Sequence, residues 1–250
     1  MLQDPDSEDS VKKMLIEAVL LHDDSELVDA VLSDNRDLLQ DCEQPLLHLA
    51  CARGSVDMAT TLIRHGADTL GCDRQFRRPI HCAVQAEPTQ SRVRLLSLLL
   101  KQHQKNGDLR RVFLARDKSG NTCMHSAAAV PDNAPVIQLL LAHKASVDFA
   151  MHKKFPDLKS PLALATMAQC VETLQVLVTA KAYVNASADE TVPLICAAQE
   201  GWLEGIQVLL QAKAYVDARD SEGMTAAHWS YQFEHYDCAE WLVSNAGASL

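Results

Sequence analysis

The hydrophobic and polar positions of this chain follow a pattern that returns every 30 to 45 residues. A short phrase of small and apolar residues, centred on positions 48, 81, 125, 163, 195 and 228, precedes a polar turn and then a run rich in Leu and Val. Apolar spacings of three and four in both segments predict two short amphipathic helices per unit. Because one helix pair cannot bury its apolar face alone, a period of this length predicts a stacked array of pairs.

The repeated phrases read LLHLA, PIHCA, CMHSA, PLALA, PLICA and AAHWS. Proline at the first position suits the first turn of a helix. The pattern resembles the ankyrin repeat family, in which Thr-Pro-Leu-His-x-Ala opens a unit of two helices. The resemblance covers residues 44–250 and implies an all-α ankyrin-repeat solenoid of about six repeats, with paired antiparallel helices and hairpin-like loops.

The ends and spacings of the array predict its boundaries. Residues 1–10 are acidic and polar, which is typical of a flexible N-terminus. Residues 11–43 have helical apolar spacing without the phrase, as a degenerate N-terminal capping repeat would. Three insertions lengthen the period and are expected in loops, near residues 86–91, 102–116 and 152–159.

Charge is segregated along the chain, whose formal net charge is −10. Residues 1–44 carry −10, residues 45–160 carry +8, and residues 161–250 carry −8. Segregated charge steers partners, so the central basic zone favours a protein partner with an acidic surface. Direct nucleic-acid binding is not expected, because the flanks and the total charge are acidic.

The eight cysteines are a second compositional clue. None has Cys-x-x-Cys spacing, so no metal site is predicted. Several occupy small-residue positions of the repeat, where buried thiols are expected in a reducing compartment. With neither a secretory signal nor a long apolar span in the sequence, we expect a cytoplasmic or nuclear protein without membrane attachment.

Candidate chemistry is sparse. The chain lacks a Gly-x-Gly-x-x-Gly fingerprint, a Gly-x-x-x-x-Gly-Lys-Ser/Thr loop and a Gly-x-Ser-x-Gly elbow. We therefore expect no catalysis, no cofactor and no small-molecule substrate. The resemblance implies that the repeated histidines bond to the backbone of neighbouring loops, at His48, His81, His125 and His228.

The resemblance implies binding through the loop tips and the concave face made by the first helix of each unit. Two tips, near 73–78 and 153–159, combine a phenylalanine with cations, a composition found at interface hot spots. Expected groove positions on the first helices include Met167, Gln199 and Glu200. The candidate protein-binding residues are Arg74, Phe76, Arg77, Arg110, Arg111, Lys118, Lys153, Lys154, Phe155, Asp189, Glu190, Trp202 and Tyr231.

The expected function is a non-catalytic adaptor or scaffold that binds a protein partner. The alternative is an inhibitor or co-regulator of a transcription factor, in the manner of inhibitor-of-Rel, Notch or GA-binding ankyrin proteins. For this alternative, the acidic segment 6–10 is similar to the inhibitor family's phosphorylated signal but lacks its Gly. The resemblance also implies possible hydroxylation of Asn185, which follows a Leu- and Ala-containing context; the other interpretation is that Asn185 only bonds its loop.

Overall fold

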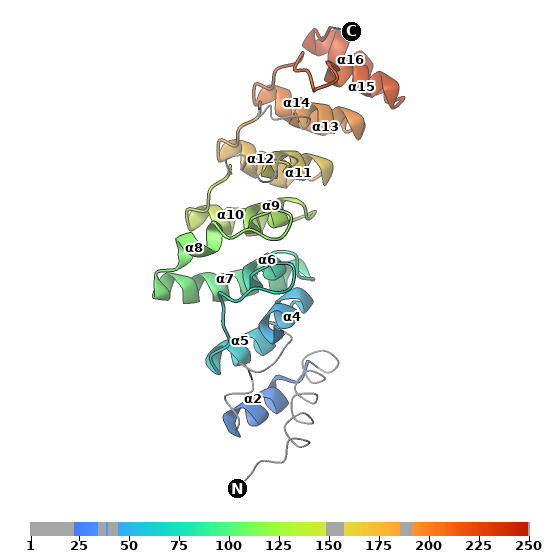
Figure 1. Cartoon of the computed structure of the whole chain (residues 1–250). Helices are drawn as coiled ribbons and strands as arrows, with labels where there is room; N and C mark the ends of the chain where they lie inside the picture. Colours follow the sequence, from blue (N-terminus) through green and yellow to red (C-terminus); the bar gives the residue numbers. More distant parts are fainter. Residues whose placement is uncertain (1–22, 35–38, 40–44, 149–157, 186–191, 250) are drawn as a thin grey trace. The chain divides into compact units, whose positions relative to one another are not determined.

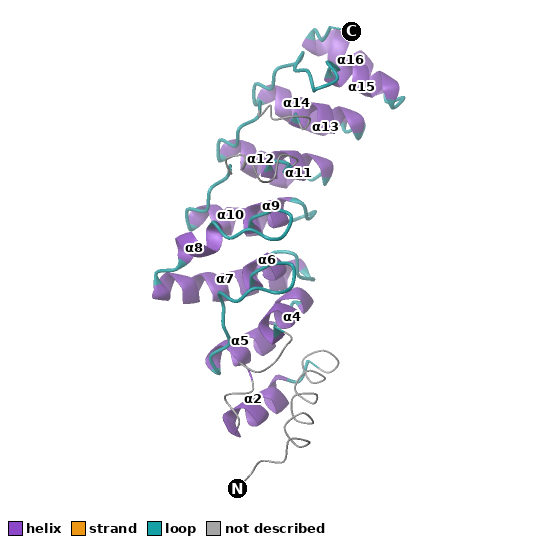
Figure 2. Cartoon of the chain, viewed as in Figure 1, coloured by secondary structure: helices purple, strands orange, loops and turns teal. Residues whose placement is uncertain are grey.

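The computed structural model describes residues 23–34, 39, 45–148, 158–185 and 192–249. These residues form helices and connecting turns, with no strand among them (Figure 2). The all-α class that the sequence predicts is therefore confirmed. The chain divides into two compact units, residues 1–118 and 119–250.

The first unit is a set of short helices that pack on their neighbours (Figure 1). Helix α4 contacts α5 and α6, α5 contacts α2 and α7, and α7 contacts α6 and α8. The helices are α2 (Ser25–Asp34), α4 (Leu46–Arg53), α5 (Val56–Arg64), α6 (Pro79–Ala83), α7 (Thr89–Asn106) and α8 (Leu109–Phe113).

The described residues of the second unit form four regular helix pairs. The first helices of successive pairs contact one another in one layer, and the second helices do so in another. The first-helix layer, called the inner layer below, is α9 (Cys123–Ala128), α11 (Pro161–Met167), α13 (Pro193–Gln199) and α15 (Ala226–Gln232). The second layer is α10 (Ala134–Ala142), α12 (Val171–Thr179), α14 (Leu203–Gln211) and α16 (Tyr236–Ala246).

The repeated phrase starts the first helices by two local devices. Proline occupies the first helical position of α6, α11 and α13, where its missing N–H costs nothing. Helices α9 and α15 instead begin after a threonine with a histidine three residues later. The N–H of Thr122 donates to Nδ1 of His125 at 3.3 Å, and the N–H of Thr225 donates to Nδ1 of His228 at 3.4 Å. Such reciprocal capping fixes the helix start.

His48 makes the bond to a neighbouring loop that the resemblance implies. Its Nε2–H donates to the carbonyl oxygen of Arg77 at 2.8 Å. Burial lowers the pKa of His48, although the bond to Arg77 opposes this shift. The repeat histidines are thus structural groups, since the bonds described for His48, His125 and His228 all lead to backbone or to capping threonines.

The longest repeat spacing corresponds to extra helix. Helix α7 has 18 residues, ends at Gly107 in the left-handed conformation, and is followed by the short helix α8. Much of the stretch 102–116, expected as a loop, is therefore helical. Val112 and Phe113 of α8 are buried, so this addition is packed and presents its other side chains from a fixed element.

The described cysteines behave as the sequence predicts. All are free, and all are buried except Cys72. Burial raises the pKa of the Cys123 thiol to about 12, so this side chain stays neutral and packs as a small apolar group.

Candidate protein-binding surfaces

The loop tip of residues 73–78 is organised by one carboxylate. Oδ1 of Asp73 accepts from the N–H of Gln75 at 2.8 Å and of Arg77 at 2.9 Å. Its Oδ2 accepts from Nε of Arg77 at 2.8 Å. Burial opposes ionisation of Asp73, but these hydrogen bonds outweigh it and lower the pKa of the carboxyl. Asp73 therefore remains charged and fixes the turn.

This turn presents Phe76 to solvent. Phe76 has a backbone φ of 58° and an exposed fraction of 59%. A bulky residue rarely adopts a positive φ, and this one gains no burial in exchange. Arg74 is exposed beside it, whereas Arg77 is half-buried against Asp73. The loop tip at Lys118 is joined to the tip of residues 73–78 by one hydrogen bond. The N–H of Lys118 donates to the carbonyl oxygen of Gln75 at 2.8 Å.

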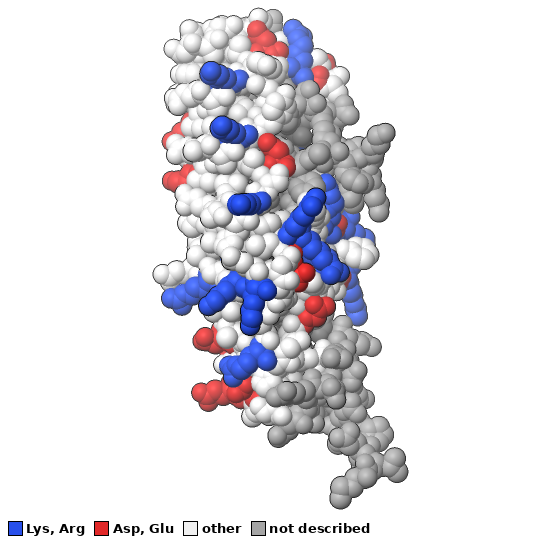
Figure 3. Space-filling view, turned by 90° about the vertical axis from the view of Figure 1, so that its left-hand side faces the viewer, with Lys and Arg blue, Asp and Glu red and all other residues white. Residues whose placement is uncertain are grey.

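The predicted residues of the first unit therefore fall in two places. Arg74, Phe76, Arg77 and Lys118 come together at the joined tips. Arg110 and Arg111 lie on α8, where both are exposed. Figure 3 shows Lys and Arg side chains gathered at the level of α7 and α8.

Other predicted residues have different outcomes. Lys153, Lys154, Phe155, Asp189 and Glu190 lie outside the described residues.

Trp202 occupies the position before α14, where its side chain makes no capping hydrogen bond, and it is half-buried. Its ring covers Gly205, where an added Cβ would lie 2.0 Å from the indole. Tyr231 is 40% exposed and meets Tyr236 edge to face at 6.2 Å. Of the two, Tyr231 has the more accessible side chain.

Asn185 joins two successive repeats. Its Nδ2 donates to the carbonyl oxygen of Lys213 at 3.0 Å, and its Oδ1 accepts from the N–H of Tyr215 at 2.8 Å. This geometry gives Asn185 a structural role. Its hydroxylation stays a prediction, which peptide mass spectrometry would test by a gain of one oxygen at Asn185.

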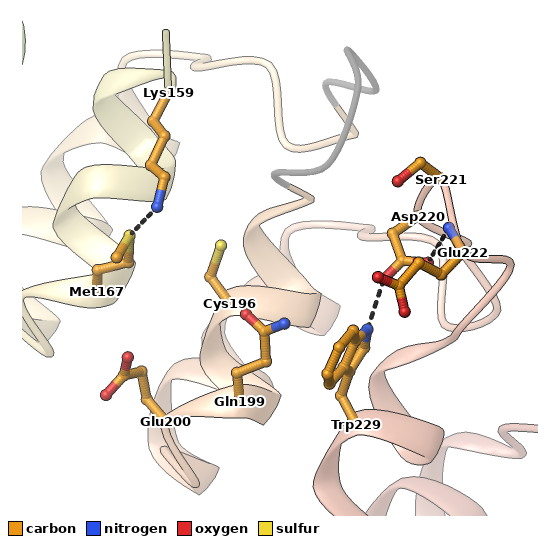
Figure 4. A pocket seen from close by; sticks show the side chains of 9 residues that line it. All are labelled: Lys159, Met167, Cys196, Gln199, Glu200, Asp220, Ser221, Glu222 and Trp229. Carbon is orange, nitrogen blue, oxygen red and sulfur yellow. Dashed lines mark hydrogen bonds between the residues drawn. The ribbon is translucent and has the colours of Figure 1, made fainter. Parts of the chain in front are cut away.

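The inner layer of the second unit contains a pocket of about 310 Å³ (Figure 4). Helices α11, α13 and α15 and the loop before α15 supply its walls. The sequence predicts Met167, Gln199 and Glu200 on this face, but it does not predict the pocket, because the pocket depends on how three repeats pack. Its lining is Lys159, Met167, Cys196, Gln199, Glu200, Asp220, Ser221, Glu222 and Trp229.

The lining of the pocket is held by specific bonds. Asp220 Oδ1 accepts from the N–H of Glu222 at 3.0 Å and of Met224 at 2.9 Å. Its Oδ2 accepts from Nε1 of Trp229 at 2.5 Å. On the wall opposite Asp220, Nζ of Lys159 donates to Sδ of Met167 at 3.2 Å.

One group in the second unit has donor atoms close enough to share a metal. Ligand atoms of Asp132, Cys170 and Glu172 lie within 4.8 Å of one another. The buried Cys170 thiol already bonds Oγ1 of Thr173 at 3.2 Å, and both carboxylates are exposed. We assign no metal to this group.

These features define a repeat protein of paired helices with exposed tips and a pocketed inner layer. The family model "Ankyrin repeats (3 copies)" matches residues 15–111 and 183–250, and the model "Ankyrin repeat" matches residues 119–151. The chain therefore belongs to the ankyrin repeat family. Ankyrin repeats imply a protein–protein interaction module, and domains of this family are typically non-catalytic.

The structure is similar to a solved ankyrin fold. The crystal structure of the human ASB11 ankyrin repeat domain aligns with a TM-score of 0.69 and 22% sequence identity. The alignment covers 86% of this chain and 90% of that one. At this identity, the likeness concerns the fold alone. A comparison with curated protein sequences finds no significant match. Within the described ranges, no helix combines the length and apolarity needed to cross a membrane.

Proposed function

We propose that the chain is an adaptor or scaffold whose first unit binds the acidic surface of a protein partner. The observation that carries this proposal is the exposed Phe76 at a tip fixed by Asp73, with Arg74 beside it and Lys118 on the joined tip. An aromatic anchor bordered by cations is a common hot-spot composition. Arg110 and Arg111 extend the same charge to α8.

The long-range charge pattern supports the same partner chemistry. The +8 zone of residues 45–160 contains the joined tips and α8. Complementary charge raises the association rate and disfavours partners of like charge. Lys153, Lys154 and Phe155 belong to this zone and stay sequence-based candidates.

Charge reversal tests the proposal. The variant Arg74→Glu, Arg110→Glu, Arg111→Glu is compared with wild type in affinity capture, followed by binding of the captured partners as purified proteins. The matched control is Lys181→Glu, Lys213→Glu, Arg219→Glu, which reverses three exposed charges outside the basic zone of residues 45–160. We expect the first variant to lose acidic partners and the control to keep them. An unchanged set of partners in both variants contradicts the proposal.

Phe76→Ala separates the anchor from the charge. Because Phe76 is exposed, its removal should leave the folded state intact. The affinity for the partner should fall about tenfold or more, which is the range of an interface hot spot. The transcription-regulator alternative depends on the segment 6–10, which lies outside the described residues, and stays a prediction.

A further inference from the structure

The pocket of the second unit has Asp220 and Glu222 on one wall and Lys159 on the other, and Glu200 also lines it (Figure 4). We propose that this pocket receives a basic side chain, specifically arginine, from a partner polypeptide. The inference rests on the proposed function, because it assumes a protein-binding module. It adds a second, oppositely charged recognition site to that module.

The carboxylates that line the pocket are prepared for a cation. Asp220 accepts three hydrogen bonds, from two backbone N–H groups and the Trp229 indole, so its carboxylate is fixed in place. Glu200 and Glu222 are exposed, and within the described parts of the chain neither forms an ion pair. These two side chains are free to pair with a cation from outside.

The balance of charge favours a cation over an anion. Three carboxylates line the pocket against one ammonium group, that of Lys159. Lys159 lies on the wall opposite Asp220, and its Nζ is turned to Sδ of Met167 on that same wall (Figure 4). A cation that enters beside Asp220 and Glu222 is therefore close to two carboxylates. The like charge of Lys159 is on the opposite wall of the pocket.

Trp229 makes arginine a better fit than a simple ammonium group. Its indole N–H is bound to Asp220, and its ring stacks on Phe233 with centroids 5.6 Å apart and planes 21° apart. The ring is thus held rigidly beside a carboxylate. A planar guanidinium group stacks on an aromatic face and pairs with a carboxylate through two parallel N–H bonds.

The floor of the pocket supplies an observation independent of the acids. Cys196 is only 5% exposed, and its Sγ points into the cavity between Met167 and Trp229 (Figure 4). This thiol forms no hydrogen bond with another residue of the described chain. Burial raises its pKa to about 11, so the thiol is uncharged and faces the occupant as a small, polarisable group.

The size of the pocket matches a side chain. A volume of about 310 Å³ lies at the bottom of the range of small-molecule sites, about 300 to 1,000 Å³. One arginine side chain with its flanking backbone suits this space and leaves the rest of the peptide on the inner layer.

Nuclear magnetic resonance of the indole N–H groups tests the inference on the full chain. The protein has three tryptophans, so its indole signals are few, and a Trp229→Phe variant assigns the relevant one. The probe is acetyl-Gly-Arg-Gly-amide. Its controls are the same peptide with citrulline, which keeps the shape without the charge, and with Glu. We expect a saturable shift of the Trp229 signal with the Arg peptide only.

A matched pair of variants tests the charges. Glu200→Gln with Glu222→Gln removes two pocket carboxylates, whereas Glu204→Gln with Glu240→Gln removes two exposed carboxylates of α14 and α16. All four positions are exposed, so folding should be preserved. We expect the pocket variant to bind the Arg peptide about tenfold more weakly and the control variant to match wild type.

Several outcomes overturn the inference. An equal response to citrulline shows that charge is not recognised, and a response to the Glu peptide shows that Lys159 dominates. Tighter binding of free arginine than of the peptide indicates a small-molecule site instead. No shift at Trp229 with any probe also contradicts it. None of these results bears on the basic tips of the first unit, so the proposed function stands or fails by its own experiment.

Discussion

Single side chains join successive repeats of the second unit. Asp148 accepts from the N–H of Tyr183 at 2.9 Å, and Asp217 accepts from the N–H of Ser249 at 2.8 Å. Asn185 fills the equivalent role between them and adds a donated bond. Each of these bonds joins two successive repeats within the second unit. A net worth of about 0.5 to 1.5 kcal/mol per bond makes these positions sensitive to substitution although they lie near the surface.

Gly201 is a residue at which both conformation and space exclude a side chain. Its φ is +62°, and an added Cβ would lie 2.6 Å from Nδ1 of His235, whose Nε2–H donates to Gln199 at 3.0 Å. We expect Gly201→Ala to lower the free energy of unfolding by about 1 to 3 kcal/mol, measured by urea denaturation. Gly223→Ala is the control, because Gly223 has a φ of +78° with open space around it. Equal losses in both variants would show that the contact with His235 has no cost.

The burial of His103 predicts that the stability of the fold depends on pH. It is fully buried on α7, and neither ring nitrogen has a hydrogen-bond partner among the described residues. Burial lowers its pKa from the ordinary 6.5, with Arg78 in the same direction and Asp108 and Asp68 opposed. Below pH 6.5 the unfolded chain therefore binds a proton that folded His103 does not, and stability falls as the pH falls.

The test of His103 is its replacement by leucine. We expect His103→Leu to lose less stability than wild type when unfolding is compared at pH 7 and pH 5. Some dependence should remain, because burial also lowers the pKa of His48. An identical loss in the variant and wild type would contradict the assignment.

At the scale of elements, the second helices end in one repeated motif. The N–H of Gly66, Lys144, Lys181 and Lys213 donates to a carbonyl three residues back, and the next N–H reaches one five residues back. All four residues have positive φ, between 65° and 92°. This is the Schellman ending, which favours glycine. Lysine occupies this position at Lys144, Lys181 and Lys213, at a conformational cost.

Lys181→Gly should therefore stabilise the protein. Glycine adopts the left-handed conformation without the Cβ clash, which outweighs its larger unfolded-state entropy and gives a gain of up to about 1 kcal/mol. Lys181→Ala is the control, since alanine keeps the Cβ and should bring no gain. Denaturation midpoints of the two variants and wild type decide the matter. A loss of stability in Lys181→Gly would indicate that the exposed lysine makes a compensating contact.

The elements were predictable from the sequence, but the sites were only partly so. The repeat period locates the helix pairs because it reflects local patterning and small-residue spacing, which one sequence displays. Exposure of Phe76 could be suspected from the flanking cations. The pocket could not, because residues from 159 to 229 meet only after three repeats stack. The helical form of much of the stretch 102–116 was also missed, since added residues in a repeat are expected to form loops.

At the scale of the whole molecule, charge separates two binding chemistries along one chain. The zone of residues 45–160 carries +8 and the zone of residues 161–250 carries −8. The proposed sites follow this division, with exposed arginines on α8 and carboxylates around the pocket. A partner for one zone is disfavoured by the other. The two proposals together therefore describe a scaffold that selects two unlike polypeptides.

Independence of the two sites is the last prediction. Arg110→Glu with Arg111→Glu should weaken the binding of acidic partners and leave the Trp229 response to the Arg peptide unchanged. Glu200→Gln with Glu222→Gln should do the reverse. In the combined variant, the changes in binding free energy should add within about 0.5 kcal/mol, as expected for two sites that share no residue. A larger coupling, measured by titrating each ligand in the presence of the other, would mean that the sites bias a common conformational equilibrium. In that case the two charge zones form one regulated surface, and each partner would change the affinity for the other by the same factor.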